Sequence, residues 1–193
     1  MIVFFKKMEL DNIAIIDAEY NEGELIQFAG IMFRRIGDGL YQISHSMNIY
    51  VKLPNGKQIN NFIRKFTGIT NYFLQKEGVD LGVAANEIEE FLSVSGSLGI
   101  VAHDIQNDND FLYDNGINID SFADEMICSY KLAQEVYKDT NQKLNLKALS
   151  FEAGFQHDNT HNALDDVWAT TAVFSLLKKL EHEELKKNEI LKS

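Results

Sequence analysis

The chain has 193 residues, of which 45% are hydrophobic and 24% are charged, and Cys128 is its single cysteine. This composition is typical of a soluble globular domain and excludes fibrous and disordered proteins. A lone cysteine excludes an internal disulfide and a zinc site built mainly from thiolates. The formal net charge of −11 argues against a passive nucleic-acid binder, because such proteins neutralise phosphates with Lys and Arg. Carboxylates that hold divalent cations would change this expectation, since bound cations attract phosphate.

No Gly/Ser-rich linker or internal repeat divides the sequence, and its single proline, Pro54, lies in a turn signal at residues 53–56. We therefore expect one domain over residues 1–193, with a core at about residues 12–180 and a C-terminal helix extension at residues 181–193. The N-terminal apolar run is too short for a signal peptide, and no later stretch approaches the roughly 20 apolar residues that span a bilayer. We expect a cytoplasmic protein with no membrane partner.

The first part of the chain predicts β-strands. Residues 12–19 contain a continuous apolar run, which is typical of a buried strand. Two β-rich stretches follow at residues 24–35 and 41–52, divided by the turn signal Gly37-Asp38-Gly39. These stretches indicate a three-stranded antiparallel meander.

The later part of the chain alternates helical and strand patterns. Helical periodicity and short apolar strands follow one another, and this order indicates an α/β protein with a mixed sheet. The expected helices are residues 84–93, 129–137, 146–153 and, most strongly, 163–187, and the expected strands are residues 98–102 and 126–128.

Two acids stand at the end of the first predicted strand. Asp17 and Glu19 are two residues apart, so the period of a strand places both on one face. Like charges in an apolar setting repel and are costly, and a cation between them relieves that cost. A strand that simply ends in solvent explains these acids equally well.

A polar loop is expected after the strand at residues 98–102, where Asp104 and Asp108 are candidate ligands. A calcium loop that starts at Asp104 is excluded, because Asn109 stands at the glycine position and Asn115 at the position of the bidentate glutamate. Taken alone, the segment is better explained as a helix N-terminus enriched in acids, which interact favourably with the helix dipole.

A third polar segment precedes the long C-terminal helix. Asn162 with Asp165 three residues later is similar to a capping box, so His161 is expected in a loop and Asp166 on the first turn. A mobile base beside a fixed ligand suits hydrolysis. An exposed loop histidine and acids at a helix N-terminus are the structural alternatives. The three segments have separate structural explanations, but they share one chemical use, which is a two-metal centre with a histidine base.

These motifs resemble, in order and spacing, those of the DEDDh family of 3′–5′ exonucleases. The resemblance covers about residues 12–180 and implies a ribonuclease H-like fold with a five-stranded mixed sheet flanked by helices. A Thr-Gly-Ile-Thr segment common in the family and its Leu-rich helix add further agreement. The matching segments are Asp17-Ala18-Glu19, His103 through Asp108 to Phe111-Leu112, His161 with Asp166, Phe66 through Thr70, and residues 144–155.

The resemblance implies two divalent metal ions, Mg²⁺ or Mn²⁺, which act on the 3′ end of single-stranded DNA or RNA. The implied metal ligands are Asp17, Glu19, Asp108 and Asp166. His161 would take a proton from the nucleophilic water, since an imidazole with an ordinary pKa of about 6.5 is largely neutral at cellular pH.

The sequence departs from the family pattern in two places. Asp104 and Asn107 replace an asparagine and an aromatic residue of the second motif, so Asp104 stays an alternative to Asp108 as a ligand. Tyr20 follows Glu19 where the family often has Thr or Phe. The implied substrate contacts are Ala18, Glu19 and Tyr20.

Other substrate contacts are predicted less directly. Phe66 and Phe73 offer faces on which a base can stack, although core packing is the favoured interpretation for both. Six basic residues could follow the backbone of a bound strand, although a solvated face is the commoner meaning of such a cluster. They are Arg34, Arg35, Lys52, Lys57, Arg64 and Lys65.

Two other functions stay open at this point. One is a catalytically silent nucleic-acid-binding module of the same fold. The other is a glycoside hydrolase that uses paired carboxylates without a metal. A homodimer is compatible with the resemblance to ribonuclease T-like proteins.

Overall fold

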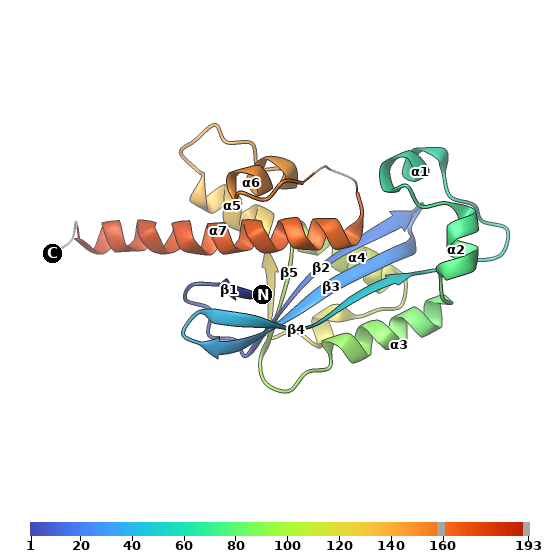
Figure 1. Cartoon of the computed structure of the whole chain (residues 1–193), viewed down its shortest axis with the longest axis horizontal. Coiled ribbons are helices and arrows are strands. Elements are labelled where there is room, and N and C mark those ends of the chain that lie inside the picture. Colours follow the sequence, from blue (N-terminus) through green and yellow to red (C-terminus); the bar gives the residue numbers. More distant parts are fainter. Residues whose placement is uncertain (158–160, 191–193) are drawn as a thin grey trace.

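A computed structural model describes residues 1–157 and 161–190 of the chain. One mixed sheet of six strands, in the order β1-β4-β3-β2-β5-β6, forms the centre of the molecule, and helices flank it (Figure 1). The strands are β1 (Ile2–Phe4), β2 (Asn12–Asn21), β3 (Glu24–Gly37), β4 (Leu40–Tyr50), β5 (Leu98–Ala102) and β6 (Glu125–Cys128).

The predicted antiparallel meander is confirmed. β2 pairs antiparallel with β3, and β3 pairs antiparallel with β4. β5 lies parallel to β2, and β6 lies parallel to β5. The mixed α/β class is therefore also confirmed.

The predicted strand number of five is wrong by one strand. β1 pairs antiparallel with β4 at the edge of the sheet, with Val3 opposite Tyr41. Three residues are too few for hydrophobic alternation to indicate a strand. The strand depends instead on this distant pairing and on Phe5, which directly follows it and is fully buried in the core.

The helices are α1 (Asn61–Thr67), α2 (Asn71–Glu77), α3 (Leu81–Leu92), α4 (Ile105–Asp114), the 3₁₀ turn η1 (Ile119–Ser121), α5 (Ser129–Val136), α6 (Leu146–Glu152) and α7 (Ala163–Ile190). The four expected helices correspond to α3, α5, α6 and α7, and the helix N-terminus favoured for the segment around Asp108 is the start of α4, whereas α1 and α2 were not predicted. α1 and α2 are short and depend on local caps: Gly68 ends α1 at φ 72°, and the Thr70 side chain accepts a hydrogen bond from the Phe73 N–H at the start of α2.

Each face of the sheet is covered by its own set of helices. Ile13 and Ile15 of β2 pack in the core cluster that contains Val167 and Phe174 of α7. The alternate β2 residues Ala14 and Ile16 pack in the cluster formed with α3 and α4. This alternation directs the next odd-numbered residues of β2 toward the side of α7.

α7 continues as one helix through residues 181–190, and residues 191–193 of the expected extension lie outside the described residues. Within the described part of the chain, no helix combines the length and the apolar character needed to cross a bilayer.

Candidate active site

The end of β2 extends beyond its neighbour β5. The parallel pairing of the two strands ends at Ile15 opposite Val101, whereas the antiparallel pairing with β3 continues, with Asp17 opposite Ala29. The β5-side edge of β2 is therefore open at Asp17 and Glu19. Both acids follow Ile13 and Ile15 in the two-residue period, so they share one face of the strand, as predicted, and this face is the α7 side of the sheet.

α4 fills the space beside this open edge. The Asp108 carboxylate accepts a hydrogen bond from the main chain of Ala18. The Tyr20 hydroxyl donates to the main-chain oxygen of Asp108 at 3.4 Å, and the Tyr20 ring stacks on Phe111 with a centroid distance of 4.7 Å. These contacts fix α4, and with it Asp108, against β2.

Of the two interpretations of the segment around Asp108, a polar loop and a helix N-terminus enriched in acids, the second is confirmed, because α4 begins at Ile105 and Asp108 lies on its first turn. Asp104 occupies the N-cap position, is exposed and makes no side-chain cap bond. Burial, and in addition charge repulsion from Asp108, raises the pKa of both Asp17 and Glu19. The spatial arrangement therefore favours Asp108 over Asp104 as a member of the acid group.

Asp166 lies on the first turn of α7 and is only 8% exposed. The predicted cap is present at Asn162, whose side-chain oxygen accepts from the Leu164 N–H at 3.2 Å. The buried Gln27 of β3, which the sequence did not single out, accepts from the Ala163 N–H at 3.3 Å and donates to Asn162 at 3.4 Å. Gln27 thus fixes the start of α7 to the sheet.

His161 lies in the loop before α7, as predicted. Its backbone is in the left-handed region, with φ 43°, which a histidine adopts more readily than most residues. Ligand atoms of Glu19, His161 and Asp166 all lie within 4.8 Å of one another. The His161 ring also meets the Phe66 ring edge to face at 4.7 Å.

A second histidine reaches the same acid. His157 Nε2 lies 2.5 Å from Asp166 Oδ1, and both side chains are almost fully buried. Sequence reasoning missed His157, and the only available signal was its position four residues before His161.

Burial and mutual repulsion destabilise the ionised forms of four acids, which we call the acid cluster: Asp17, Glu19, Asp108 and Asp166. Burial, followed by the charges of the other three acids, raises the pKa of Asp17 well above its ordinary value. Burial and neighbouring acids raise the pKa of Glu19 to about 8 and that of Asp108 to about 7. Burial raises the pKa of Asp166, and the nearby His157 opposes this.

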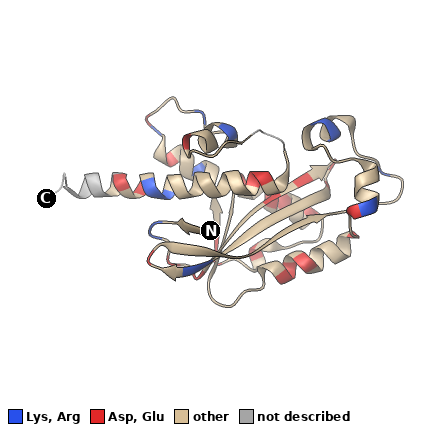
Figure 2. Cartoon of the chain, in the orientation of Figure 1, with Lys and Arg blue, Asp and Glu red and all other residues tan. Residues whose placement is uncertain are grey.

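The acid cluster has the chemistry of a divalent metal site. Figure 2 shows acidic positions at the end of β2 and on the first turn of α7, and ligand atoms of Glu19 and Asp166 lie within 4.8 Å of each other. Several buried carboxylates with raised pKa values are stabilised when a cation neutralises them, and carboxylate oxygens are the ligands that Mg²⁺ and Mn²⁺ prefer. The residues present therefore fit a divalent cation.

Exposed aromatic rings lie beside His161. Phe62 and Phe66 of α1 are 62% and 44% exposed, and their ring centroids are 4.3 Å apart. We call these two residues the aromatic pair. The core packing favoured for Phe66 is therefore wrong, whereas Phe73 does pack against its neighbours, meeting the Tyr50 ring edge to face at 4.7 Å. Tyr20 is largely enclosed by its contacts with α4, and this burial raises the pKa of its hydroxyl.

The six basic residues are close in sequence but not in space. Arg34 and Arg35 lie at the far end of β3 from the acid cluster, and Arg35 pairs with Asp11 at 3.8 Å. Lys57 pairs with Glu24. Basic residues do lie on α1 (Figure 2), where Arg64 and Lys65 are exposed beside the aromatic pair; Lys52 is also exposed.

His103 of the second motif serves the fold and not the acid cluster. Its Nδ1 lies 3.0 Å from the Ser129 hydroxyl, and its Nε2 lies 3.2 Å from the main-chain oxygen of Leu144. Burial lowers its pKa. His103 therefore ties the segment before α6 to the end of the sheet through these two contacts.

Known structures share this fold. The nuclease domain of 3′hExo, a DEDDh family member bound to rAMP, is 17% identical with a TM-score of 0.72, and the match covers 89% of this chain and 93% of that one. E. coli exonuclease I in complex with a dT13 oligonucleotide is also 17% identical with a TM-score of 0.72, over 92% of this chain and 43% of that one. The zinc ion-bound E. coli exonuclease I–ssDNA complex is 19% identical with a TM-score of 0.68, over 89% of this chain and 41% of that one.

The chain thus spans less than half the length of exonuclease I. A comparison with curated protein sequences finds no match. The exonuclease family of the ribonuclease T type, in contrast, matches residues 10–174. This range contains the four acids and the histidine that the DEDDh pattern requires. The chain therefore belongs to the ribonuclease T family of exonucleases and is of the DEDDh type.

Proposed function

We propose that the chain is a 3′–5′ exonuclease that hydrolyses phosphodiester bonds at the 3′ end of single-stranded DNA or RNA, with two divalent cations, Mg²⁺ or Mn²⁺, in the acid cluster. The observation that carries this proposal is the convergence of β2, α4 and the start of α7 on four carboxylates and one histidine. The rAMP, dT13 and zinc ion in the similar structures support it.

The acids take different parts in this proposal. Asp17 is the acid whose pKa is raised by all three of the others, so we assign it to both cations. We assign Glu19 and Asp166, whose ligand atoms lie close together, to one cation, and Asp108 to the other. When bound, such a pair supplies a hydroxide nucleophile near neutral pH and stabilises the leaving 3′ oxygen.

His161 is the proposed general base. Among the described histidines, His161 is the one whose ring nitrogen lies close to carboxylate oxygens of both Glu19 and Asp166. In its neutral form it can accept the proton of the attacking water. The Phe66 ring restricts the orientation of the His161 imidazole from one side. His157 holds Asp166 and is a positioning residue.

The aromatic pair is proposed to hold the terminal nucleotide. Phe62 and Phe66 expose ring faces next to the general base, and base–aromatic stacking is tolerant of sequence. Exposed Arg64 and Lys65 on the same helix can contact phosphates. Ala18 and Tyr20 would act mainly through the backbone and by fixing α4, which bears Asp108.

Purified protein incubated with 5′-labelled single-stranded DNA and RNA in Mn²⁺ or Mg²⁺ tests the proposal. We expect a ladder that shortens by one nucleotide at a time from the 3′ end, and we expect EDTA to abolish it. A 3′-labelled strand should lose its label in the first step. Binding without any shortening would indicate a catalytically silent module, and activity that resists EDTA would exclude the metal site.

A further inference from the structure

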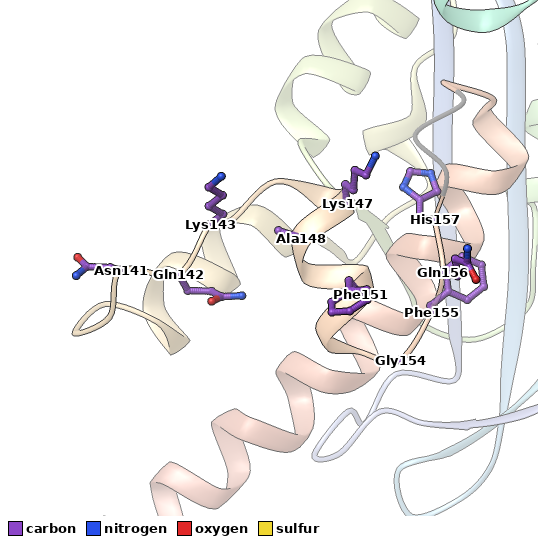
Figure 3. A pocket seen from close by; sticks show the side chains of 10 residues that line it. All are labelled: Asn141, Gln142, Lys143, Lys147, Ala148, Phe151, Gly154, Phe155, Gln156 and His157. Atoms are coloured by element: carbon purple, nitrogen blue, oxygen red, sulfur yellow. The ribbon is translucent and has the colours of Figure 1, made fainter.

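A groove lies beside α6, between the loop that precedes this helix and the segment that leads to the catalytic histidine. Figure 3 shows Phe151 of α6 between the loop at residues 141–143 and the segment at residues 154–157. The groove has a volume of about 870 Å³, within the range of about 300–1,000 Å³ that ligand sites occupy. We call it the α6 groove, and it is lined by Asn141, Gln142, Lys143, Lys147, Ala148, Phe151, Gly154, Phe155, Gln156 and His157.

The charge of this groove differs from that of the whole chain. The protein has 29 acidic and 18 basic residues, yet no acidic residue is among those that line the groove. Lys143 and Lys147 are exposed, and neither forms an ion pair with any residue in the described part of the chain. Other lysines do pair, as Lys57 does with Glu24 and Lys178 with Glu181. Among the described residues, the groove therefore presents two lysine cations without an ion-pair partner.

The groove also contains aromatic rings and side-chain amides, and hydrogen bonds hold the loop and the helix that bear them together. Phe151 is 81% exposed, the largest exposed fraction among the exposed large hydrophobic residues of the described chain. Glu152, next to it, accepts hydrogen bonds from the Tyr137 hydroxyl at 2.6 Å and from Gln142 Nε2 at 2.7 Å. These bonds use both carboxylate oxygens and hold the loop against α6. Cations, an exposed ring and amide groups together match a nucleotide, which has phosphate, a base face and polar edges.

The groove leads directly to the acid cluster. His157 lines the groove, and its Nε2 lies 2.5 Å from Asp166 Oδ1. The aromatic pair lies on α1, on the other side of the first turn of α7 from α6 (Figure 1). A scissile phosphodiester in the acid cluster has a terminal nucleotide on one side and the rest of its strand on the other. The two surfaces correspond to these two sides.

We propose that the α6 groove binds the upstream, 5′-side nucleotides of the strand whose 3′ end lies in the acid cluster. Lys143 and Lys147 contact phosphates of this strand, and Phe151 stacks on one of its bases. This inference rests on the proposed exonuclease function. It gives the enzyme a contact that a long single strand makes and that a single nucleotide is too short to reach.

Substrates of different length test the proposal. A double variant, Lys143→Gln with Lys147→Gln, should raise KM for a dodecanucleotide about tenfold, while KM for a mononucleotide p-nitrophenyl ester stays within about twofold of wild type. Because each lysine releases counterions from the strand, the slope of log affinity against log salt should fall by about 1.4. Phe151→Ala should raise KM for the dodecanucleotide about tenfold.

Matched controls separate the groove from general charge and exposure. Lys131→Gln with Lys179→Gln removes the same charge from exposed positions on α5 and α7, and Tyr113→Ala removes an exposed ring at the end of α4. Both controls should behave as wild type. Groove variants that match the controls on the dodecanucleotide, or that impair the ester equally, would overturn the proposal.

Binding measured by fluorescence anisotropy of the labelled dodecanucleotide distinguishes a failure of the groove proposal from a failure of the proposed exonuclease function. If the wild type hydrolyses neither the strand nor the ester, the proposed function fails. Weaker strand binding by the lysine variant would then still support the groove as a strand site, and unchanged binding would overturn it.

Discussion

The acid cluster is largely buried and consists of like charges, whereas the aromatic pair on α1 and the α6 groove are exposed and carry rings or cations. The cluster is assembled from three elements that are distant in sequence, and each surface comes from one or two neighbouring segments. We infer from this difference that the acid cluster performs the chemistry, whereas the aromatic pair and the α6 groove position the strand. Substitutions in the cluster should therefore change turnover, and substitutions in the flanking surfaces should change KM.

The largest effect is expected at Asp17, which interacts with all three other acids. Asp17→Asn keeps the shape of the side chain but removes a charge, and metal-ion stabilisation of the transition state contributes several kcal/mol. We expect kcat to fall about 1,000-fold or more. The change is measured by single-turnover cleavage of a labelled strand in Mn²⁺. Asp114→Asn, at an exposed position at the end of α4, is the control, and an active Asp17→Asn protein would contradict this role.

The next largest effect is expected at His161. His161→Ala should lower kcat about 100- to 10,000-fold, the usual contribution of a general base, with little change in the Kd for the strand. Separate measurements of kcat and of strand binding by anisotropy check this result. A parallel loss of binding and turnover would instead indicate that His161 holds the substrate.

Smaller effects are expected at the aromatic pair. Phe62→Ala and Phe66→Ala should each raise KM about tenfold, because stacking of one base contributes about 1–3 kcal/mol. Phe62→Ala should leave kcat within about twofold of wild type, whereas Phe66→Ala should also lower kcat modestly, because Phe66 contacts His161. Tyr72→Ala on the neighbouring helix, where the ring is 75% exposed, is the control. Equal effects of all three substitutions on KM would contradict the assignment.

The smallest expected effect concerns stability and pH. Burial and neighbouring acids raise the pKa of Glu19 from 4.5 to about 8 in the folded chain. The stabilising contribution of the protonated carboxyl is therefore complete below about pH 4.5 and is lost as pH rises toward 8. Glu19→Gln should flatten this decline and raise the free energy of unfolding of metal-free protein at pH 8 by ~1–2 kcal/mol. Urea unfolding in EDTA at several pH values measures this.

Added Mn²⁺ provides the second half of that test. At pH 8 the cation should raise the Tm of the wild type more than that of Glu19→Gln, because the variant has lost one ligand. Glu87→Gln, at an exposed position on α3, should match the wild type in both conditions. A metal-free protein whose free energy of unfolding does not change between pH 5 and 8 would contradict the raised pKa of Glu19 in the acid cluster.

The same division between buried and exposed parts explains what the sequence could predict. Buried strands and long helices have strong periodicity, so β2 and α7 were expected almost at their observed bounds. The spacing of Asp17 and Glu19 on a strand, and of His161 and Asp166 around a helix start, predicts chemistry because backbone period alone places these side chains.

The remaining features depend on tertiary contacts. No local pattern marks Gln27 as the anchor of α7, and the position of His157 four residues before His161 is too weak a signal to identify it as a neighbour of Asp166. The exposure of Phe62, Phe66 and Phe151 follows from how their short helices pack, whereas core packing was the favoured interpretation for Phe66. β1 was missed because its three residues depend on pairing with β4.

Titration of metal-free protein with Mn²⁺, followed by the loss of the free Mn²⁺ electron paramagnetic resonance signal, counts the divalent cations that the acid cluster binds. We predict that wild-type protein binds two Mn²⁺ ions per chain at pH 8, that Asp17→Asn weakens binding of both ions, and that Asp114→Asn binds as the wild type does. Wild-type protein that binds no Mn²⁺, or Asp17→Asn protein that binds both ions unchanged, would contradict a metal centre in the acid cluster.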